Sequence, residues 1–165
     1  MLQDDSPVEF VPPASDDGFA VNQLIEESPP LDTNSIYCNL LQCSHFSETS
    51  VCAKSGSKLL GFISGYLVPA KPDTLFIWQV VVDSSARGRG LALQMLNKLI
   101  SRPDCSQVKF LETTITPDNR ASLKLFQKFA EQKKATVEVS EAFTKTQHFN
   151  GQHDTELLHR IGPLT

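Results

Sequence analysis

The sequence predicts an α/β fold of the α+β kind, with one mixed sheet of about seven strands and four helices. Its 165 residues are 40% hydrophobic and 21% charged, which is ordinary for a single domain spanning residues 1–165. The apolar run Leu75–Val82 is followed by a glycine-rich turn and an amphipathic run from Leu91, which predicts a strand, a turn and a helix. Similar signals along the whole chain give the order β-α-α-β-β-β-α-β-α-β-β.

Proline pairs and polar turns delimit the elements of the first half. Pro12-Pro13 and Pro29-Pro30 each end a segment, because proline cannot continue a helix or a central strand. The expected elements are a strand at Val8–Val11, a helix from an N-cap at Ser15 to about Ser28, a helix capped by Asp32, Thr33 or Asn34, and strands at Ser50–Lys54 and Leu59–Val68. The second helix is expected to bury the side that carries Ile36, Tyr37, Leu40 and Leu41.

The central strand follows a turn at Pro69–Asp73 and is expected to be buried on both faces. Leu75–Val82 is apolar apart from Gln79, as strands covered on both sides are. The remaining expected elements are a helix at Leu91–Ile100, a strand at Val108–Thr114, a helix opened by the turn Thr116–Asn119, and strands at Thr136–Val139 and Leu157–Ile161. The polar loop Ser140–Thr155 is long enough to suggest a functional role.

Composition excludes several classes of function. The net charge of −4 and the pI near 5.5 argue against nucleic acid and anionic membranes as partners. The four cysteines form no Cys-x-x-Cys pair and are expected to be reduced thiols. The N-terminal MLQDDSPVEF lacks an apolar leader segment, and no apolar run reaches membrane-spanning length. We therefore expect a cytoplasmic protein.

The turn Arg87-Gly88-Arg89-Gly90-Leu91-Ala92 predicts an anion site. A glycine-rich turn that enters a helix leaves backbone N–H groups without partners, and the helix dipole adds positive charge there. Two arginines make phosphate or pyrophosphate the natural ligand. A P-loop is excluded because Leu91-Ala92-Leu93 supplies neither the lysine nor the magnesium-binding hydroxyl. A Rossmann fingerprint fails because Leu93 replaces its third Gly or Ala and too few β-α repeats follow.

The pattern Arg-x-x-Gly-x-Ala, here Arg87, Gly90 and Ala92, resembles the acyl-CoA loop of the GCN5-related N-acetyltransferase family. The resemblance implies this family's fold, with a splayed central strand pair, and acetyl-CoA as co-substrate. In the family the loop amides hold the pyrophosphate and the preceding strand pairs with the pantetheine arm. The cofactor-binding residues that it implies are Gln79, Val80, Val82, Arg87, Gly88, Arg89, Gly90, Leu91, Ala92 and Asn119. Asn119 has an equally good interpretation as a helix N-cap.

Four further stretches narrow the resemblance within the family. Residues 28–46, 61–82, 111–126 and 153–164 resemble the members that acetylate the γ-amine of L-2,4-diaminobutyrate on the route to ectoine, an osmoprotectant. The resemblance implies this substrate and a homodimer, and the chemistry requires no metal. Two alternatives remain open. The acceptor is another amine, such as a polyamine, an amino acid or a protein lysine, or the chain is a non-catalytic acyl-CoA-binding module.

Candidate catalytic residues follow from the need to deprotonate an ammonium and to protonate a thiolate. Glu112 and Glu156 are the candidate bases, and Glu112 is alternatively an ammonium anchor or one member of an ion pair. Many family members carry a tyrosine acid seven residues after the helix-opening asparagine, where this chain has Phe126. Phe126 is therefore assigned to the core, and the proton comes from water or from Tyr37.

Candidate substrate-binding residues supply acidic groups and aromatic walls for a substrate with two ammonium groups. They are Asp32, Tyr37, Trp78, His153 and Glu156. Four of them have a plainer alternative: a helix N-cap for Asp32, core packing for Trp78, and solvated loop charges for His153 and Glu156. His153 and Glu156, in an extended segment, would point to opposite faces, so their spacing predicts no metal site. His45, His148 and His159 are expected at surface or edge positions.

Overall fold

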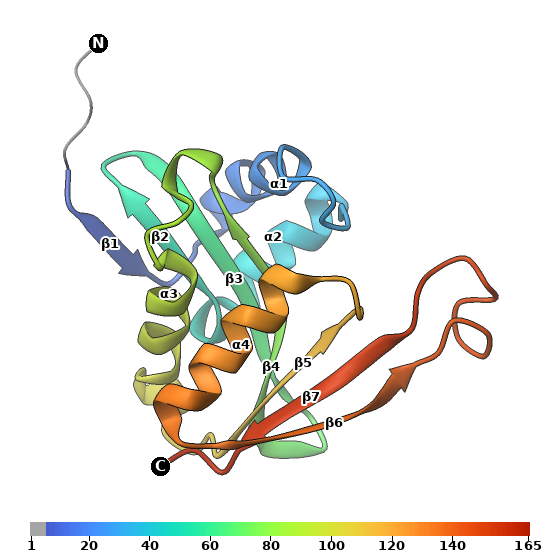
Figure 1. Cartoon of the computed structure of the whole chain (residues 1–165). Coiled ribbons are helices and arrows are strands. Elements are labelled where there is room, and N and C mark those ends of the chain that lie inside the picture. The colour runs from blue at the N-terminus through green and yellow to red at the C-terminus, as the bar shows by residue number, and fades with distance from the viewer. Residues whose placement is uncertain (1–5) are drawn as a thin grey trace. The chain divides into compact units, whose positions relative to one another are not determined.

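The predicted order of strands and helices is confirmed. The structure, a computed structural model, describes residues 6–165, so the expectation for the N-terminal segment lies partly outside the described residues. The helices are α1 (Gly18–Glu26), α2 (Ile36–Ser44), α3 (Leu91–Ile100) and α4 (Arg120–Lys133). The strands are β1 (Val8–Val11), β2 (Val51–Ser55), β3 (Lys58–Val68), β4 (Lys71–Val82), β5 (Phe110–Ile115), β6 (Thr136–Phe143) and β7 (Glu156–Gly162) (Figure 1).

The seven strands are hydrogen-bonded in the order β1-β2-β3-β4-β5-β7-β6. β4 and β5 run parallel, and the neighbouring pairs β1-β2, β2-β3, β5-β7 and β7-β6 are antiparallel. The parallel pairing covers Thr74–Ile77 of β4 against Phe110–Thr113 of β5, although β4 continues to Val82. The predicted mixed sheet with a central pair that parts is therefore present.

The chain divides into two compact units. The first contains residues up to Tyr66 and Gln79–Ser106, and the second contains Leu67–Trp78 and the chain from Gln107 to Thr165. The division falls inside β3 and β4, so each of these strands contributes residues to both units.

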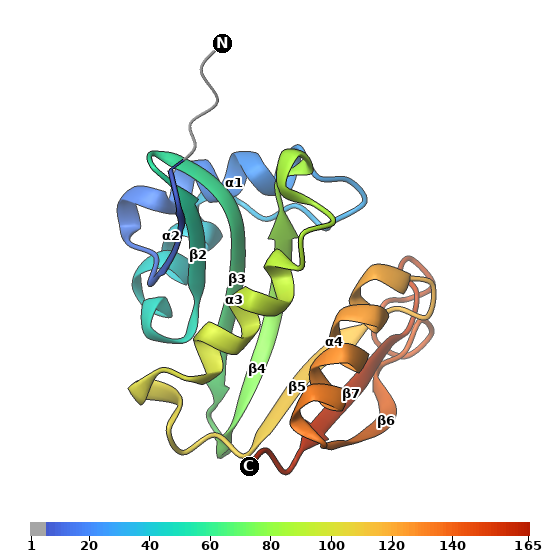
Figure 2. The ribbon, with the colours of Figure 1, turned by 60° about the vertical axis from the view of Figure 1, so that its left-hand side comes forward.

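In the first unit, helices lie on both faces of the strands. Phe62 of β3 belongs to a buried cluster with residues of α1 and α2. Its neighbour Gly61 faces the other way, and a Cβ on Gly61 would lie 2.7 Å from Cε of Met95 in α3. A larger residue at this position would therefore require the Met95 side chain of α3, which packs over β3, to move (Figure 2). The cluster on the α1–α2 face consists of Val21, Leu24, Ile25, Cys43, Cys52, Phe62 and Val81.

In the second unit, α4 lies across one face of β5 and β7 (Figures 1 and 2). Leu75, Leu111 and Ile161 form one buried row across β4, β5 and β7. The next row, on the opposite face, contains Phe76, Glu112 and Arg160. Phe126 of α4 is 3% exposed, which confirms its assignment to the core.

Several predicted boundaries are wrong. A 3-10 turn over Ser15–Asp17 precedes α1, so Ser15 is not its N-cap. Ser35 caps α2 by accepting a hydrogen bond from Cys38 N, so the predicted cap at Asp32, Thr33 or Asn34 is wrong. β4 begins within the predicted turn, at Lys71, and β6 continues to Phe143 inside the predicted loop. Hydrogen-bonded pairing to a neighbouring strand extends both segments beyond what their composition indicates.

The buried side of α2 was also predicted incorrectly. Ile36 and Tyr37 are exposed, whereas Asn39, Gln42 and Cys43 face the core. Hydrophobic periodicity failed here because polar side chains on this face hydrogen-bond one another inside the protein, although Gln42 Nε2 has no partner among residues 6–165.

The cysteine and membrane expectations fit what the structure describes. All four cysteines are free thiols. Burial raises the pKa of Cys43 and Cys52 to about 12, so neither is a reactive thiolate at neutral pH. Among residues 6–165, no helix has both the length and the apolar character needed to cross a membrane.

Candidate functional site

The glycine-rich turn between β4 and α3 has the backbone geometry of an anion site. Gly88 has φ +80° and Gly90 φ +71°, values that L-residues rarely adopt. Gly90 is the N-cap of α3 and provides no capping side chain. The first amides of α3, beginning at Leu91, therefore receive no side-chain cap and are oriented toward an incoming anion.

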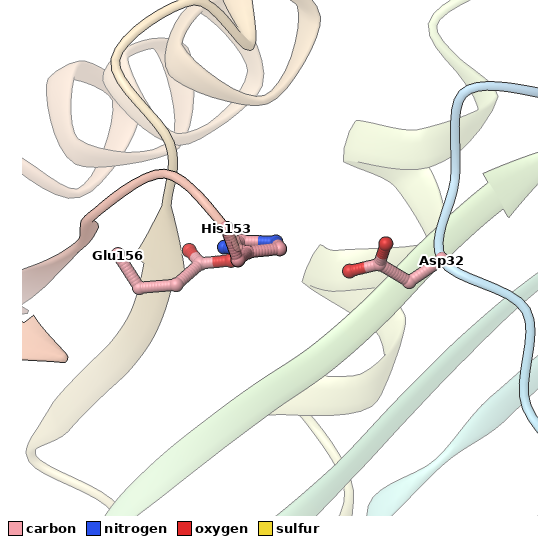
Figure 3. Close-up of side chains that lie close together, drawn as sticks. All are labelled: Asp32, His153 and Glu156. Carbon is pink, nitrogen blue, oxygen red and sulfur yellow. The ribbon is translucent and has the colours of Figure 1, made fainter. Parts of the chain in front are cut away.

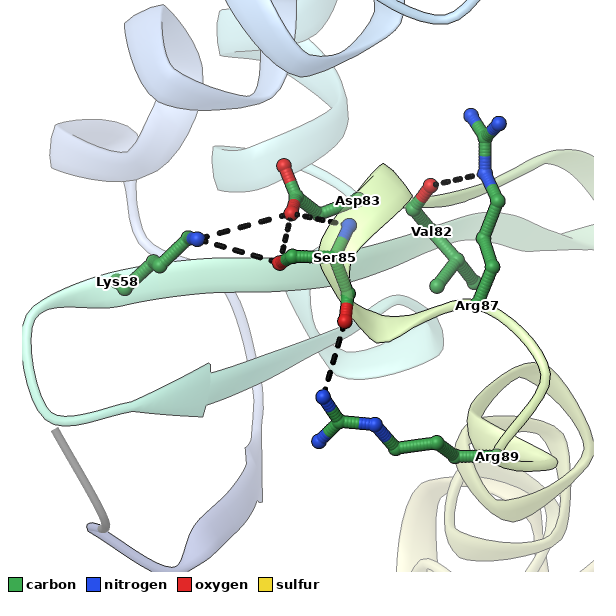
Figure 4. Close-up of polar contacts among 6 residues, drawn as sticks. All are labelled: Lys58, Val82, Asp83, Ser85, Arg87 and Arg89. Carbon is green, nitrogen blue, oxygen red and sulfur yellow. Dashed lines mark hydrogen bonds and ion pairs between the residues drawn. The ribbon is translucent and has the colours of Figure 1, made fainter. Parts of the chain in front are cut away.

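Both arginines of the turn are held by backbone carbonyls (Figure 4). Arg87 Nε donates to Val82 O at 3.2 Å, and Arg89 Nη2 donates to Ser85 O at 2.9 Å. Each bond uses one of the five N–H donors of a guanidinium. The two cations are thus oriented by the loop itself, with further donors left over for phosphate oxygens.

The start of the turn is fixed by a small polar cluster, also drawn in Figure 4. Asp83 accepts hydrogen bonds from Ser85 N, at 3.0 Å, and from the Ser85 hydroxyl. Lys58 Nζ lies 3.7 Å from Asp83 Oδ2 and donates to Ser85 Oγ at 3.2 Å. The hydrogen bonds from Ser85 and the charge of Lys58 hold the pKa of Asp83 below its ordinary value, so this anchor stays charged.

Gln79 connects β4 to the loop between α1 and α2. Its Nε2 donates to Asp32 O at 2.7 Å, and its Oε1 accepts from Asn34 Nδ2 at 2.7 Å. Its backbone N–H donates to Ser64 Oγ at 3.1 Å. Of the three β4 residues predicted to meet the cofactor, Gln79 therefore already has partners for its side chain and its amide.

Asp32 and Tyr37 are both exposed in the first unit. Because Ser35 caps α2, the alternative of Asp32 as an N-cap is excluded. The Asp32 backbone is anchored through its carbonyl, and its carboxylate is drawn in Figure 3. Tyr37, in the first turn of α2, is 69% exposed.

Glu112 is buried in the second unit and ion-paired. It is 4% exposed, and its Oε1 accepts from Arg160 Nη1 at 2.8 Å and from Lys71 Nζ at 3.1 Å. Arg160 is its direct cross-strand partner, and the guanidinium carbon of Arg160 lies 3.8 Å from the centroid of the Phe110 ring. Of the predicted roles of Glu112, the ion pair is the one that the structure contains.

His153 and Glu156 point toward each other (Figure 3). The distance from His153 Nε2 to Glu156 Oε1 is 3.9 Å. The prediction that they face opposite sides is wrong, because His153 lies in a bend before β7 rather than in extended chain. The centroid of the Phe149 ring lies 4.5 Å from that of the His153 ring, so the two side chains pack together at the end of the long loop.

The structure also places four other predicted site residues. Trp78 is 43% exposed, so the central strand is not buried on both faces and core packing does not explain this residue. Asn119 is the N-cap of α4, where its Oδ1 accepts from Ser122 N at 3.2 Å. Val80 and Val82 are half-buried at the end of β4.

Two polar features were missed by sequence reasoning. A chain of buried amides, formed by Asn22, Asn39 and Gln42, lies between α1 and α2. The sequence signal that could have indicated it is the spacing of Asn39 and Gln42, three positions apart on one side of a helix. His159 was expected at the surface but is 9% exposed, and its Nε2 has no hydrogen-bond partner among residues 6–165. Burial lowers the pKa of His159, which favours the neutral imidazole.

Known proteins resemble this chain along most of its length. The profile of the acetyltransferase (GNAT) family matches residues 19–130. L-2,4-diaminobutyric acid acetyltransferase from Methylotuvimicrobium alcaliphilum is 51% identical over 92% of this chain and 88% of its own length. The enzyme of that name from Vibrio cholerae is 48% identical over the same shares.

A solved structure is also similar to this chain over nearly its whole length. Diaminobutyrate acetyltransferase EctA from Paenibacillus lautus, in complex with its substrate L-2,4-diaminobutyric acid and coenzyme A, is 38% identical to this chain. It superposes with a TM-score of 0.91 and covers 96% of both chains.

Proposed function

Because this chain belongs to the GNAT family of acetyltransferases, we propose that it transfers the acetyl group of acetyl-CoA to the γ-amine of L-2,4-diaminobutyrate. The observation that carries this proposal is the high identity, over nearly the whole chain, to relatives named for this substrate. The γ-nitrogen bonds to the acetyl carbon, the carbon–sulfur bond breaks, and coenzyme A leaves as a thiol. The product is the precursor of ectoine.

The turn Arg87–Ala92 binds the pyrophosphate of coenzyme A in this proposal. The support is its geometry: positive φ at Gly88 and Gly90, uncapped amides at the start of α3, and two arginines oriented by carbonyls. Backbone groups of Val80 and Val82 pair with the pantetheine arm, and Asn119 supports the cofactor from α4. These residues position the thioester for attack, which is the main contribution of an acetyltransferase.

The substrate is bound by Asp32, Tyr37, Trp78, His153 and Glu156. Asp32 supplies a carboxylate for an ammonium group, and the exposed indole of Trp78 supplies an aromatic wall. An alkyl ammonium titrates near the lysine value of about 10.4, so attack requires removal of a proton. Glu156, oriented beside His153, is better suited to this role than Glu112, whose Oε1 is shared by two cations. Tyr37 or water protonates the thiolate.

The assembly and location are part of the same proposal. We place the enzyme in the cytoplasm as a homodimer, as the resemblance implies, and the two units of the chain act as one acetyltransferase domain. No step of the chemistry requires a metal ion. Size-exclusion chromatography with light scattering tests the dimer, and activity after exhaustive chelation tests metal independence.

An acceptor panel tests the reaction. The enzyme is mixed with acetyl-CoA and with diaminobutyrate, a polyamine, lysine or a lysine peptide, and thiol release is followed. Of these acceptors, we expect only diaminobutyrate to give fast thiol release, and NMR should assign the acetyl group of the product to the γ-nitrogen. Thiol release that no acceptor stimulates would contradict the proposal and favour a non-catalytic acyl-CoA-binding module.

Three variants divide the proposed site into its two halves. Arg87→Ala raises KM for acetyl-CoA by about tenfold, the value of one charge-assisted hydrogen bond. Asp32→Asn and Glu156→Gln weaken the use of diaminobutyrate as acceptor far more than they weaken the binding of coenzyme A. Titration calorimetry measures the affinity for each ligand. Equal losses for both ligands would contradict the assignment of Asp32 and Glu156.

A further inference from the structure

The buried amides between α1 and α2 form one connected chain. Asn22, Asn39 and Gln42 are 3%, 0% and 1% exposed. Asn39 Nδ2 donates to Gln42 Oε1 at 2.9 Å, and Asn22 Nδ2 donates to Asn39 Oδ1 at 2.9 Å. Buried amides impose direction, because each donor must meet an acceptor. The two helices are therefore held in one register by groups that carry no charge.

The series of hydrogen-bonded amides ends on the loop that carries Asp32. Asn22 Nδ2 also donates to the backbone carbonyl of Asn34, at 3.1 Å. The side chain of Asn34 then donates to Gln79, and Gln79 donates to the carbonyl of Asp32. Asn34 is thus held on one side by a helix and on the other by β4. Leu31, the residue before Asp32, packs against the buried cluster of the same unit.

We infer that Gln79, held by the amide chain through Asn34, is a positioning residue that fixes the Asp32 carboxylate for the substrate ammonium. The inference rests on the proposed function, in which Asp32 binds the substrate. It also reassigns Gln79, which the sequence resemblance placed among the cofactor-binding residues.

Neutral amides suit this task better than ions. A cation beside Asp32 would compete with the substrate ammonium for the carboxylate, whereas an amide that binds the main-chain carbonyl leaves the carboxylate charge unchanged. The Gln79 side chain spans two loop residues, Asp32 and Asn34, at 2.7 Å each. Two short bonds from one planar group fix the orientation of the loop as well as its distance from β4.

The test compares KM values for the two substrates in Gln79→Met, which keeps length but removes both hydrogen bonds. We expect KM for diaminobutyrate to rise about tenfold, and KM for acetyl-CoA to stay within about twofold. In an Asp32→Ala background the same substitution should add less than about twofold, because a residue that acts through Asp32 has nothing left to position. Gln127→Met, at an exposed glutamine of α4, is the matched control.

The outcomes separate the inference from the proposed function. A wild-type enzyme that fails to acetylate diaminobutyrate overturns the function and the role of Asp32 with it. If the wild-type enzyme does acetylate diaminobutyrate, three results overturn the inference only. They are an unchanged KM for diaminobutyrate in Gln79→Met, an increase in KM for acetyl-CoA alone, and full additivity of Gln79→Met with Asp32→Ala. If Gln79→Met does not fold, Asn34→Ala removes one of the two bonds and should raise the amine KM about threefold, and an unchanged value overturns the inference.

Discussion

The two units bury polar groups by opposite means. In the first unit, neutral amides from α1 and α2 hydrogen-bond one another and hold a loop, and Gln42 Nε2 is the one buried donor among them that has no partner within the described residues. In the second unit, the carboxylate of Glu112 is buried in the sheet between Arg160 and Lys71. Arg160 is further covered by the ring of Phe110 and donates to Thr74 Oγ1 at 3.3 Å.

The difference indicates what each network does. An amide chain depends on short, directional bonds, so its loss moves a specific loop while leaving the charge balance intact. An ion cluster depends on charge compensation, so removing one member leaves the others in an unfavourable environment. The amide chain therefore serves geometry near the proposed substrate residue, and the ion cluster serves the stability of the sheet.

Glu112→Gln should give the largest effect. Removing the charge leaves Arg160 without its anion, and we expect a loss of about 2–3 kcal/mol in the free energy of unfolding, less than the full cost of breaking a buried pair because Gln still accepts a hydrogen bond. The turnover number should stay within about threefold of wild type, whereas loss of a general base costs about a hundredfold or more. Urea unfolding and steady-state kinetics measure the two quantities.

Glu138→Gln is the matched control for this substitution. Glu138 faces Arg160 across the β6–β7 pair but is exposed, so its loss should change the unfolding free energy by less than about 0.5 kcal/mol. If Glu112→Gln is as stable as wild type but its turnover number falls about a hundredfold or more, Glu112 is the base. The second network would then serve catalysis and not stability.

Asn39→Leu should have a smaller effect on stability and a larger one on function. The substitution removes the central link of the amide chain, and we expect a loss of about 2 kcal/mol from donors and acceptors left unsatisfied. KM for diaminobutyrate should rise with it, while KM for acetyl-CoA does not. Chemical denaturation and kinetics at saturating co-substrate check both. A pure stability loss with unchanged amine KM would mean that the network holds the helices and not the loop.

His159 should give the smallest effect, and it appears only as a function of pH. Its pKa is lowered in the folded state by burial, so the unfolded chain binds more protons below about 6.5. The stabilisation is present above the unfolded pKa and is lost as pH falls through the folded pKa. We expect the melting temperature to fall on acidification from pH 7, and to fall less steeply in His159→Gln. His45→Gln, at the exposed end of α2, controls for the loss of one imidazole.

Sequence and structure agree best where a feature is local. The order of elements, the helix after Gly90 and the glycine-rich turn before it depend on periodicity and on residues close in the chain, and all were predicted. They disagree where partners are distant. The apolar residues of α2 were assigned to the core, but Asn39 on its other side is hydrogen-bonded to Asn22 of α1, which also donates to the loop. A hydrophobicity pattern cannot weigh that compensation.

The sequence alone therefore determined the family, the order of strands and helices, and the glycine-rich turn before α3. Glycine positions, hydrophobic periods and a motif of six residues are properties of neighbouring residues. Tertiary structure alone decided that Gln79 holds Asn34, 45 positions away, and that Glu112 pairs with Arg160, 48 positions away. Strand register places Arg160 opposite Glu112 across β5 and β7, and Asn34 meets Gln79 because the loop before α2 is hydrogen-bonded to β4.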